Sequence, residues 1–174
     1  MRRVIVILMA VLFMLSGCGG HKGPQRPSRR MGEAPQADSA QIALMELNMQ
    51  MAQNADRELQ AIAQSKEGEY TLYEQGAWVH IIQHGDVYSE PIHDGEECVL
   101  HMRVSSLNGT LYYDLHNSYR IGQNELPAAV RQNIREWHHG SRMQILAPWY
   151  SAYGLSGTEV VPPYENVIIE LEIE

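Results

Sequence analysis

The last part of the chain constrains its fold most strongly. Two short segments, 143–147 and 167–174, carry large apolar residues at the spacing of strands, and in the second segment acidic residues alternate with them. Between the segments, Pro148 starts a loop that reaches Ala152-Tyr-Gly154 and returns through Pro162-Pro163, whose rings stiffen the turn. The pattern therefore predicts two strands that frame one structured loop.

The region before this loop predicts a sheet and one helix. Asn108-Gly109 is a strong hairpin signal, because both residues tolerate the positive φ that a two-residue turn requires. A helix is expected from Glu125-Leu-Pro127 to Gly140, with Val130, Ile134 and Trp137 along one face. Further strands are expected at 70–73, 77–82, 98–104, 110–113 and 119–121. One antiparallel sheet with one helix across it is an α+β domain, expected over 68–174.

Residues 40–67 contain good helix formers and neither Gly nor Pro, so an N-terminal helical segment is expected there, with a break at 54–56. Its apolar residues are rich in methionine, which suits an adaptable surface. Two arrangements remain open at this point. Either the segment packs on the 68–174 domain, which is slightly favoured, or residues 40–66 form an arm for a homodimer or for holding client proteins.

The start of the chain predicts export. Arg2-Arg3, an apolar run and a small-residue exit form a lipoprotein signal peptide over 1–17. Leu15-Ser-Gly-Cys18 resembles a bacterial lipobox, which implies lipidation of Cys18 after cleavage and attachment to a membrane. The expected location is therefore the cell envelope, lipid-anchored and facing the periplasm, with the outer membrane weakly favoured by Gly19.

Residues 18–39 are rich in Gly, Pro, Gln and Arg and are expected to be a disordered tether. Six of the 13 lysines and arginines lie within residues 1–30, whereas all 21 aspartates and glutamates follow them. The acidic body argues against nucleic acid as a partner, because nucleic acid requires a basic surface. The basic tether either rests on anionic lipid head groups or is a solvated linker, and the linker is favoured.

The sequence contains two cysteines and eight histidines. If Cys18 carries lipid, Cys98 has no internal disulfide partner, and it is interpreted as a small core hydrophobe in a strand rather than a reactive thiol. The histidines are either adjacent, as at His138-His139, or flank a strand, and their spacing indicates no tight ligand set. Neither a metal site nor a cofactor is expected.

Several short motifs resemble those of the FKBP-type peptidyl-prolyl cis-trans isomerases. They are Asp94-Gly95, Val99-Leu-His-Met102, Asn108-Gly-Thr-Leu-Tyr112, Tyr119-Arg-Ile-Gly122, Glu125-Leu-Pro127, Gly140-Ser-Arg142 and Ala152-Tyr-Gly154. They follow one another without gaps, while residues 40–83 match only loosely. The chain is most similar to the lipoprotein form of the gram-negative envelope, which carries helices before the domain. The resemblance implies an FKBP-like antiparallel half-barrel sheet wrapped on one helix, preceded by N-terminal helices.

The same resemblance implies an apolar pocket for a prolyl residue. Tyr153 and Tyr112 would be catalytic, with the Tyr153 hydroxyl donating to the substrate backbone. Five positions depart from the family pattern. Where the family has a Trp at the floor of the pocket, this chain has Val130, and where it has a Tyr in the pocket wall, this chain has Met102. Tyr113 replaces an Asp of the family, and Asn117 and Ile169 each replace a Phe. The substrate-binding residues would be Leu126, Pro127, Val130, Val160, Val161, Ile169, Met102 and Tyr113.

The implied function is a peptidyl-prolyl isomerase that assists folding of envelope or secreted proteins, with proline-containing polypeptides as clients. An apolar pocket would favour the twisted X–Pro amide over the planar one. The alternative is a non-catalytic peptide-binding or chaperone module on the same fold. Two alternatives concern single residues. Tyr153 is either a site residue or a core tyrosine that holds its loop. Because side chains alternate along a strand, only one of Tyr112 and Tyr113 is expected in the pocket.

Overall fold

The computed structural model describes residues 39–123 and 125–174. The predicted signal peptide 1–17 and the predicted lipidation at Cys18 lie outside the described residues. So does the predicted tether 18–39, apart from Ser39, which begins a helix.

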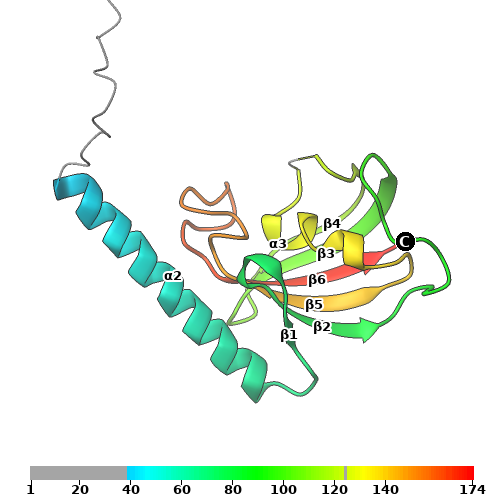
Figure 1. Ribbon diagram of the computed structural model, residues 1–174, viewed down its shortest axis with the longest axis horizontal. Coiled ribbons are helices and arrows are strands. Elements are labelled where there is room, and N and C mark those ends of the chain that lie inside the picture. Colours follow the sequence, from blue (N-terminus) through cyan, green and yellow to red (C-terminus); the bar gives the residue numbers. More distant parts are fainter. Residues whose placement is uncertain (1–38, 124) are drawn as a thin grey trace, which may run out of the picture. The chain divides into compact units, whose positions relative to one another are not determined.

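The described chain forms one open antiparallel sheet, shown in Figure 1, with a long helix beside it. The strand order is β1-β2-β5-β6-β3-β4, so the sequence-distant β3 and β6 lie side by side. The strands are β1 Thr71–Leu72, β2 Trp78–Gln83, β3 Glu97–Ser106, β4 Leu111–Arg120, β5 Arg142–Ala147 and β6 Val167–Ile173. The predicted α+β class and antiparallel sheet are confirmed, including the hairpin at Asn108-Gly109 that joins β3 to β4.

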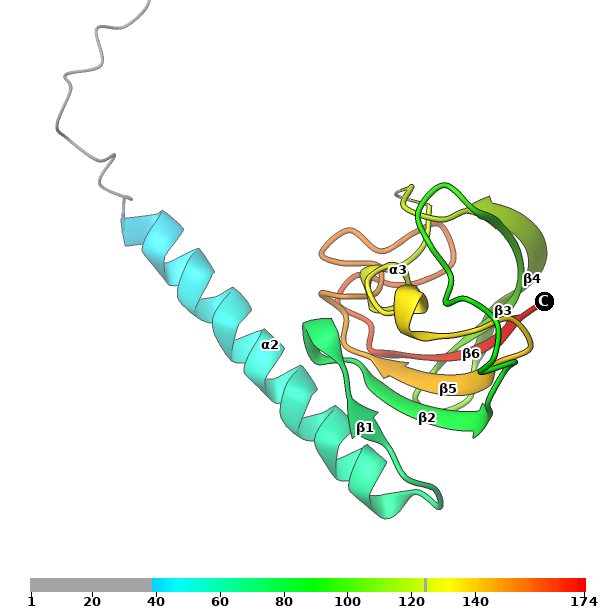
Figure 2. The same cartoon turned by 45° about the vertical axis from the view of Figure 1, so that its right-hand side comes forward.

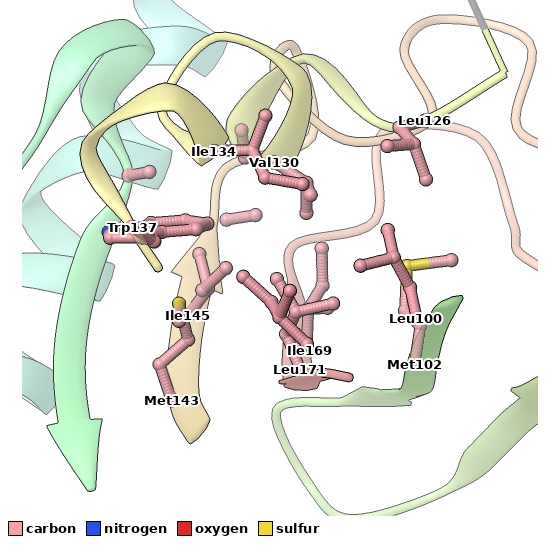
Figure 3. Packing of buried hydrophobic residues seen from close by; sticks show 14 of the residues in the cluster. Leu100, Met102, Leu126, Val130, Ile134, Trp137, Met143, Ile145, Ile169 and Leu171 are labelled. Atoms are coloured by element: carbon pink, nitrogen blue, oxygen red, sulfur yellow. The ribbon is translucent and has the colours of Figure 1, made fainter. Parts of the chain in front are cut away.

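The core lies on one face of this sheet, where alternate strand residues are buried. Figure 3 shows Leu100 and Met102 from β3 beside Ile169 and Leu171 from β6 in this core. The side chains of the short helix α3, Ala128–Arg131, cover the cluster, and Val130 is among its fully buried members.

The predicted helix from Glu125 to Gly140 is wrong in length. The chain instead forms α3 and a separate 3-10 turn, η2, at Ile134–Glu136, and Trp137 is extended with φ −112° and ψ 164°. Asn133 explains the break, because its side-chain Nδ2 donates to the carbonyl of Ala129 at 2.8 Å. That carbonyl is the one an α-helix would offer to the Asn133 main-chain N–H, which bonds Val130 O instead. Ile134 and Trp137 are nevertheless buried, as their spacing predicted.

Two other predicted boundaries differ from the structure. The expected short strands 110–113 and 119–121 belong to the single strand β4. The expected break at 54–56 is absent, because α2 runs continuously from Ser39 to Ser65. Asn54 does not cap a new helix there, since its side-chain oxygen accepts a hydrogen bond from Arg57 one turn on.

The two halves of α2 have different surroundings, as Figure 2 shows. In the C-terminal half, Leu59 and Ala63 are buried against Leu146 of β5. In the N-terminal half five large apolar side chains are about half exposed or more: Ile42, Leu44, Met45, Leu47 and Met49. The expectation that the helix packs on the domain therefore holds for its second half. No helix within 39–123 or 125–174 combines the length and apolarity that a membrane span needs.

Candidate functional site

A β-bulge places two adjacent tyrosines on the same side of the sheet. Val104 of β3 pairs with Tyr113 and the next residue, Ser105, pairs with Leu111, so Tyr112 is the extra residue of β4. Both Tyr112 and Tyr113 are half-buried and pack against the main core cluster. Alternation therefore does not separate the two tyrosines, because a bulge interrupts the period of two. That only one of them belongs to the site stays a prediction.

The loop between β5 and β6 is held in shape by its own main chain. Gly154 N donates to Trp149 O at 2.8 Å, and Thr158 N donates to Val161 O at 2.8 Å. Ala129 N, at the start of α3, donates to Ser151 O at 2.9 Å, which joins the loop to α3. These bonds fix the position of Tyr153 above the core.

The phenol of Tyr153 lies against that of Tyr113. Their ring centroids are 5.7 Å apart with an interplanar angle of 85°, an edge-to-face contact. The Tyr153 hydroxyl is buried and makes no well-formed hydrogen bond to any of the residues described. Burial, followed by the nearby Tyr113 hydroxyl, raises the pKa of Tyr153 strongly, so this phenol stays protonated and remains a donor.

Tyr112 has a different environment. Its hydroxyl donates to the Glu165 carboxylate at 3.0 Å, which ties β4 to the residues just before β6. Partial burial, and then the Glu165 carboxylate, raise the pKa of Tyr112. Because its hydroxyl already has a partner, Tyr112 offers a ligand mainly its ring.

The other predicted wall residues are mostly beneath the surface. Figure 3 shows Val130 of α3 facing the part of the core that holds Ile169, with Leu126 and Met102 nearby. A fully buried side chain cannot contact a ligand, so a prolyl ring reaches Val130 or Ile169 only if the side chains that cover them move. Val160 is the opposite case, since it is 52% exposed and does not join the core cluster. The buried predicted residues are Met102, Leu126, Pro127, Val130, Val161 and Ile169.

Two residues near the tyrosines were not predicted as site members. Thr158 lies within hydrogen-bonding reach of Tyr113, and Tyr119 acts electrostatically on both Tyr113 and Tyr153. A strand period of two, counted from Tyr113, would have placed Tyr119 on the same face. No comparable sequence signal marks Thr158, because it lies in a loop. We call Tyr112, Tyr113, Tyr119 and Tyr153 the tyrosine cluster.

A second group of side chains lies outside the tyrosine cluster. One ligand atom from each of Glu96, Cys98 and His139 lies within 4.8 Å of the others. The sequence did not indicate this group, because Glu96 and His139 are 43 positions apart.

No protein-family profile matches the chain, and no curated protein matches it in sequence. Solved structures do match. FkpA from Escherichia coli superposes with a TM-score of 0.60 at 16% identity, over 78% of this chain and 63% of that one. A peptidyl-prolyl cis-trans isomerase from Pseudomonas syringae gives 0.58 at 16% identity, over 71% and 92%. The N-terminal domain of FKBP42 from Arabidopsis thaliana gives 0.54 at 22% identity, over 63% and 92%.

These likenesses confirm the predicted fold, which is that of the FKBP-type isomerases. The chain spans 63% of the length of the FkpA chain that it matches. At this level of identity the shared property is the fold alone.

Proposed function

We propose that this protein binds proline-containing polypeptide segments at the tyrosine cluster and speeds the cis-trans isomerisation of their X–Pro bonds. The observation that carries the proposal is the Tyr153 hydroxyl, which is buried, protonated and without a well-formed hydrogen bond among the described residues. Buried polar groups are nearly always paired, and the contact of this donor with the Tyr113 hydroxyl is not a well-formed hydrogen bond, so the donor is suited to a ligand acceptor.

The chemistry needs no nucleophile. Rotation about the peptide bond crosses a barrier of about 18–20 kcal/mol because it destroys amide resonance. A water-poor surface favours the twisted, less polar amide, and this difference in binding lowers the barrier. The rings of Tyr112, Tyr113 and Tyr153 would supply the apolar surface. The Tyr153 hydroxyl, which is buried in the free protein, would hold a substrate carbonyl once the neighbouring Tyr113 ring moves aside.

The proposal includes a location and a client class, both of which rest on the sequence. Lipid on Cys18 would attach the chain to the cell envelope on the periplasmic side, with the outer membrane favoured. The clients would be envelope or secreted proteins that fold there. The exposed apolar residues of α2 support the idea that residues 40–66 form a homodimer arm. Replacing Leu44 and Met45 by glutamate should then convert a dimer of the full chain to a monomer in a mass measurement, and a monomeric parent would refute the arm.

A proline-limited peptide assay with the full chain tests the main proposal. We expect the parent to accelerate isomerisation and Tyr153→Phe to lower kcat/KM by about tenfold, the effect of one lost hydrogen bond to substrate. Tyr88→Phe is the matched control, since Tyr88 is 97% exposed on the loop between β2 and β3, and it should leave the rate unchanged. A parent rate equal to that of buffer would refute catalysis.

One observation favours the second candidate, a non-catalytic peptide-binding module. Val130 and Ile169 are fully buried, and Tyr113 lies against Tyr153. The module would bind extended peptide on the tyrosine rings without twisting the bond. It predicts that a proline-containing peptide binds the parent, and binds Tyr153→Phe more weakly, with no acceleration in either.

A further inference from the structure

The group of Glu96, Cys98 and His139 lies at the N-terminal end of β3, where Cys98 pairs with Tyr119 of β4. Glu96 immediately precedes β3, Cys98 is its second residue, and Tyr113 pairs near its other end with Val104. His139 lies between η2 and β5. The group brings together a carboxylate, a thiol and an imidazole, with ligand atoms no more than 4.8 Å apart. This donor set suits zinc, which binds sulfur, nitrogen and oxygen ligands in proteins.

The orientation of the His139 ring is set by the end of β6. Its Nδ1 lies 2.6 Å from the main-chain oxygen of Glu174, and its Nε2 lies 2.7 Å from Oε1 of Glu96. A main-chain oxygen can only accept, so Nδ1 carries a proton. Metal-bound histidines have this arrangement, in which one ring N–H donates to a carbonyl and the other nitrogen faces the metal.

Cys98 and Glu96 complete the donor set. Cys98 is a free cysteine that is 1% exposed, and its thiol lies near the Glu96 carboxylate. Burial, and then Glu96, raise the pKa of Cys98 to about 11, so without a metal it holds its proton. His93 lies at the open side, with its Nδ1 3.0 Å from Oε2 of Glu96. A fourth ligand could therefore come from His93 or from water.

We propose that Glu96, Cys98 and His139 form a binding site for a thiophilic divalent metal ion of the zinc type. A divalent ion with one carboxylate, one thiolate and a neutral imidazole has no net charge, which favours a partly buried site. Binding releases the thiol proton of Cys98 and, where His139 is an imidazolium, its Nε2 proton. The ion forms bonds to sulfur, nitrogen and oxygen, and no electron is transferred.

The geometry requires a small adjustment. Ligand bonds of about 2.0–2.3 Å around a tetrahedral ion put neighbouring ligand atoms about 3.3–3.7 Å apart. The Glu96–His139 separation of 2.7 Å is a hydrogen bond, so the two side chains must part to admit the ion. The side chains of Glu96 and His139 are 22% and 37% exposed, which leaves them room to rotate.

Cobalt(II) tests the site in the full chain carrying Cys18→Ser, which leaves Cys98 as its only thiol. We expect a thiolate-to-cobalt charge-transfer band together with tetrahedral ligand-field bands, both displaced by Zn²⁺. Cys98→Ala should abolish the charge-transfer band. Because Cys98 is buried, Glu96→Gln and His139→Gln provide second variants at partly exposed positions, and each should weaken Co²⁺ binding at least tenfold.

His101→Gln is the matched control, because the His101 imidazole also contacts a carboxylate, that of Asp114 at 2.6 Å, on the outer face of the sheet. It should bind Co²⁺ as the parent does. The proposal is overturned if the parent shows no thiolate band, if the band persists in Cys98→Ala, or if only His101→Gln loses binding. Each of these outcomes is read from Co²⁺ binding, so none of them depends on isomerase activity.

Discussion

The edge of one tyrosine ring meets the face of another where β4 approaches the loop between β5 and β6: Tyr113 and Tyr153 have ring centroids 5.7 Å apart and planes at 85°. The bulge at Tyr112 brings Tyr113 there, and the hydrogen bond from Ala129 N to Ser151 O holds the loop that carries Tyr153. The contact buries the Tyr153 hydroxyl without giving it a well-formed partner among the described residues. Five predictions follow from this contact, from the packing of α2, from the Glu96–His139 pair and from the β5–β6 loop.

The stability of Tyr153→Phe separates a structural role of its hydroxyl from a functional one. An unpartnered buried polar group costs about 1–3 kcal/mol, so removing the hydroxyl should leave the free energy of unfolding unchanged or raise it by up to about 1 kcal/mol. Denaturant unfolding measures this. A decrease in the free energy of unfolding of more than about 1 kcal/mol would show that the hydroxyl has a stabilising partner in the folded chain. The argument that this hydroxyl binds a ligand would then fail.

Two leucines on α2 should respond differently to truncation. Leu59 is fully buried against the sheet, so Leu59→Ala should lower the free energy of unfolding by about 2–5 kcal/mol. Leu44 lies on the same helix but is 57% exposed, so in the monomeric chain, without the proposed dimer contact, Leu44→Ala should change it by less than about 0.5 kcal/mol. Amide hydrogen exchange along α2 adds a local measurement, since only Leu59→Ala should speed exchange in the C-terminal half of the helix. Equal effects of the two variants would contradict this division of the helix.

Stability should fall on the alkaline side of neutrality through His139. Its hydrogen bond to Glu96, and then the one to the main-chain oxygen of Glu174, raise the pKa of His139 above its ordinary value of 6.5. A raised pKa contributes stability that is fully present below the unfolded pKa and is lost as pH rises through the folded one. The parent's Tm, measured with a chelator, should therefore drop more between about pH 6 and pH 9 than that of His139→Gln.

The stabilisation by Glu96 has the opposite pH dependence and is lost at low pH. The hydrogen bond from His139 lowers the pKa of Glu96 below 4.5, so its stabilisation is present above that value and is lost as pH falls through the lowered pKa. Glu96→Gln should flatten the acid limb of the same Tm profile, while His93, which also faces Glu96, remains. Superimposable profiles of parent and both variants would show that the pair does not contribute.

Alanine substitutions at two glycines in the β5–β6 loop should destabilise the fold to different extents, because the space around the two glycines differs. Gly154 and Gly157 have φ values of +72° and +62°, so alanine at either adopts a strained left-handed backbone, at about 1–2 kcal/mol. A Cβ at Gly154 meets nothing within 4 Å, whereas one at Gly157 would overlap the main-chain oxygen of Val161. Gly157→Ala should therefore destabilise the fold more than Gly154→Ala in denaturant unfolding. The reverse order would mean that the loop relaxes away from Val161.

The sequence was most informative where local pattern and tertiary environment agree. Asn108-Gly109 predicted the β3–β4 hairpin because the turn chemistry is contained in two residues. The period-two pattern of 167–174 predicted β6, whose alternate residues Val167, Ile169, Leu171 and Ile173 are buried. The spacing of Val130, Ile134 and Trp137 correctly indicated a buried face, even though the continuous helix was wrong.

The failures share a cause. At Asn133 a side-chain amide takes the carbonyl that the helix would have used, and at Tyr112 an extra residue reverses the strand alternation. Both are single-residue competitions: Asn133 competes for a carbonyl four residues earlier, and Tyr112 is left out of the pairing with β3. The placement of the predicted wall residues is a third example, because burial of Val130 and exposure of Val160 depend on how the β5–β6 loop folds back.

By itself, the sequence determined that this chain makes an antiparallel sheet, a helical N-terminal segment and a proline-stiffened loop, because turn residues and apolar periodicity act over a few positions. Only the tertiary structure decided which side chains meet, as Tyr113 meets Tyr153 and as Glu96 meets His139. The physical reason is that strand register, a bulge and loop closure bring together residues that are about 40 positions apart, and small local differences in those features change which groups come into contact.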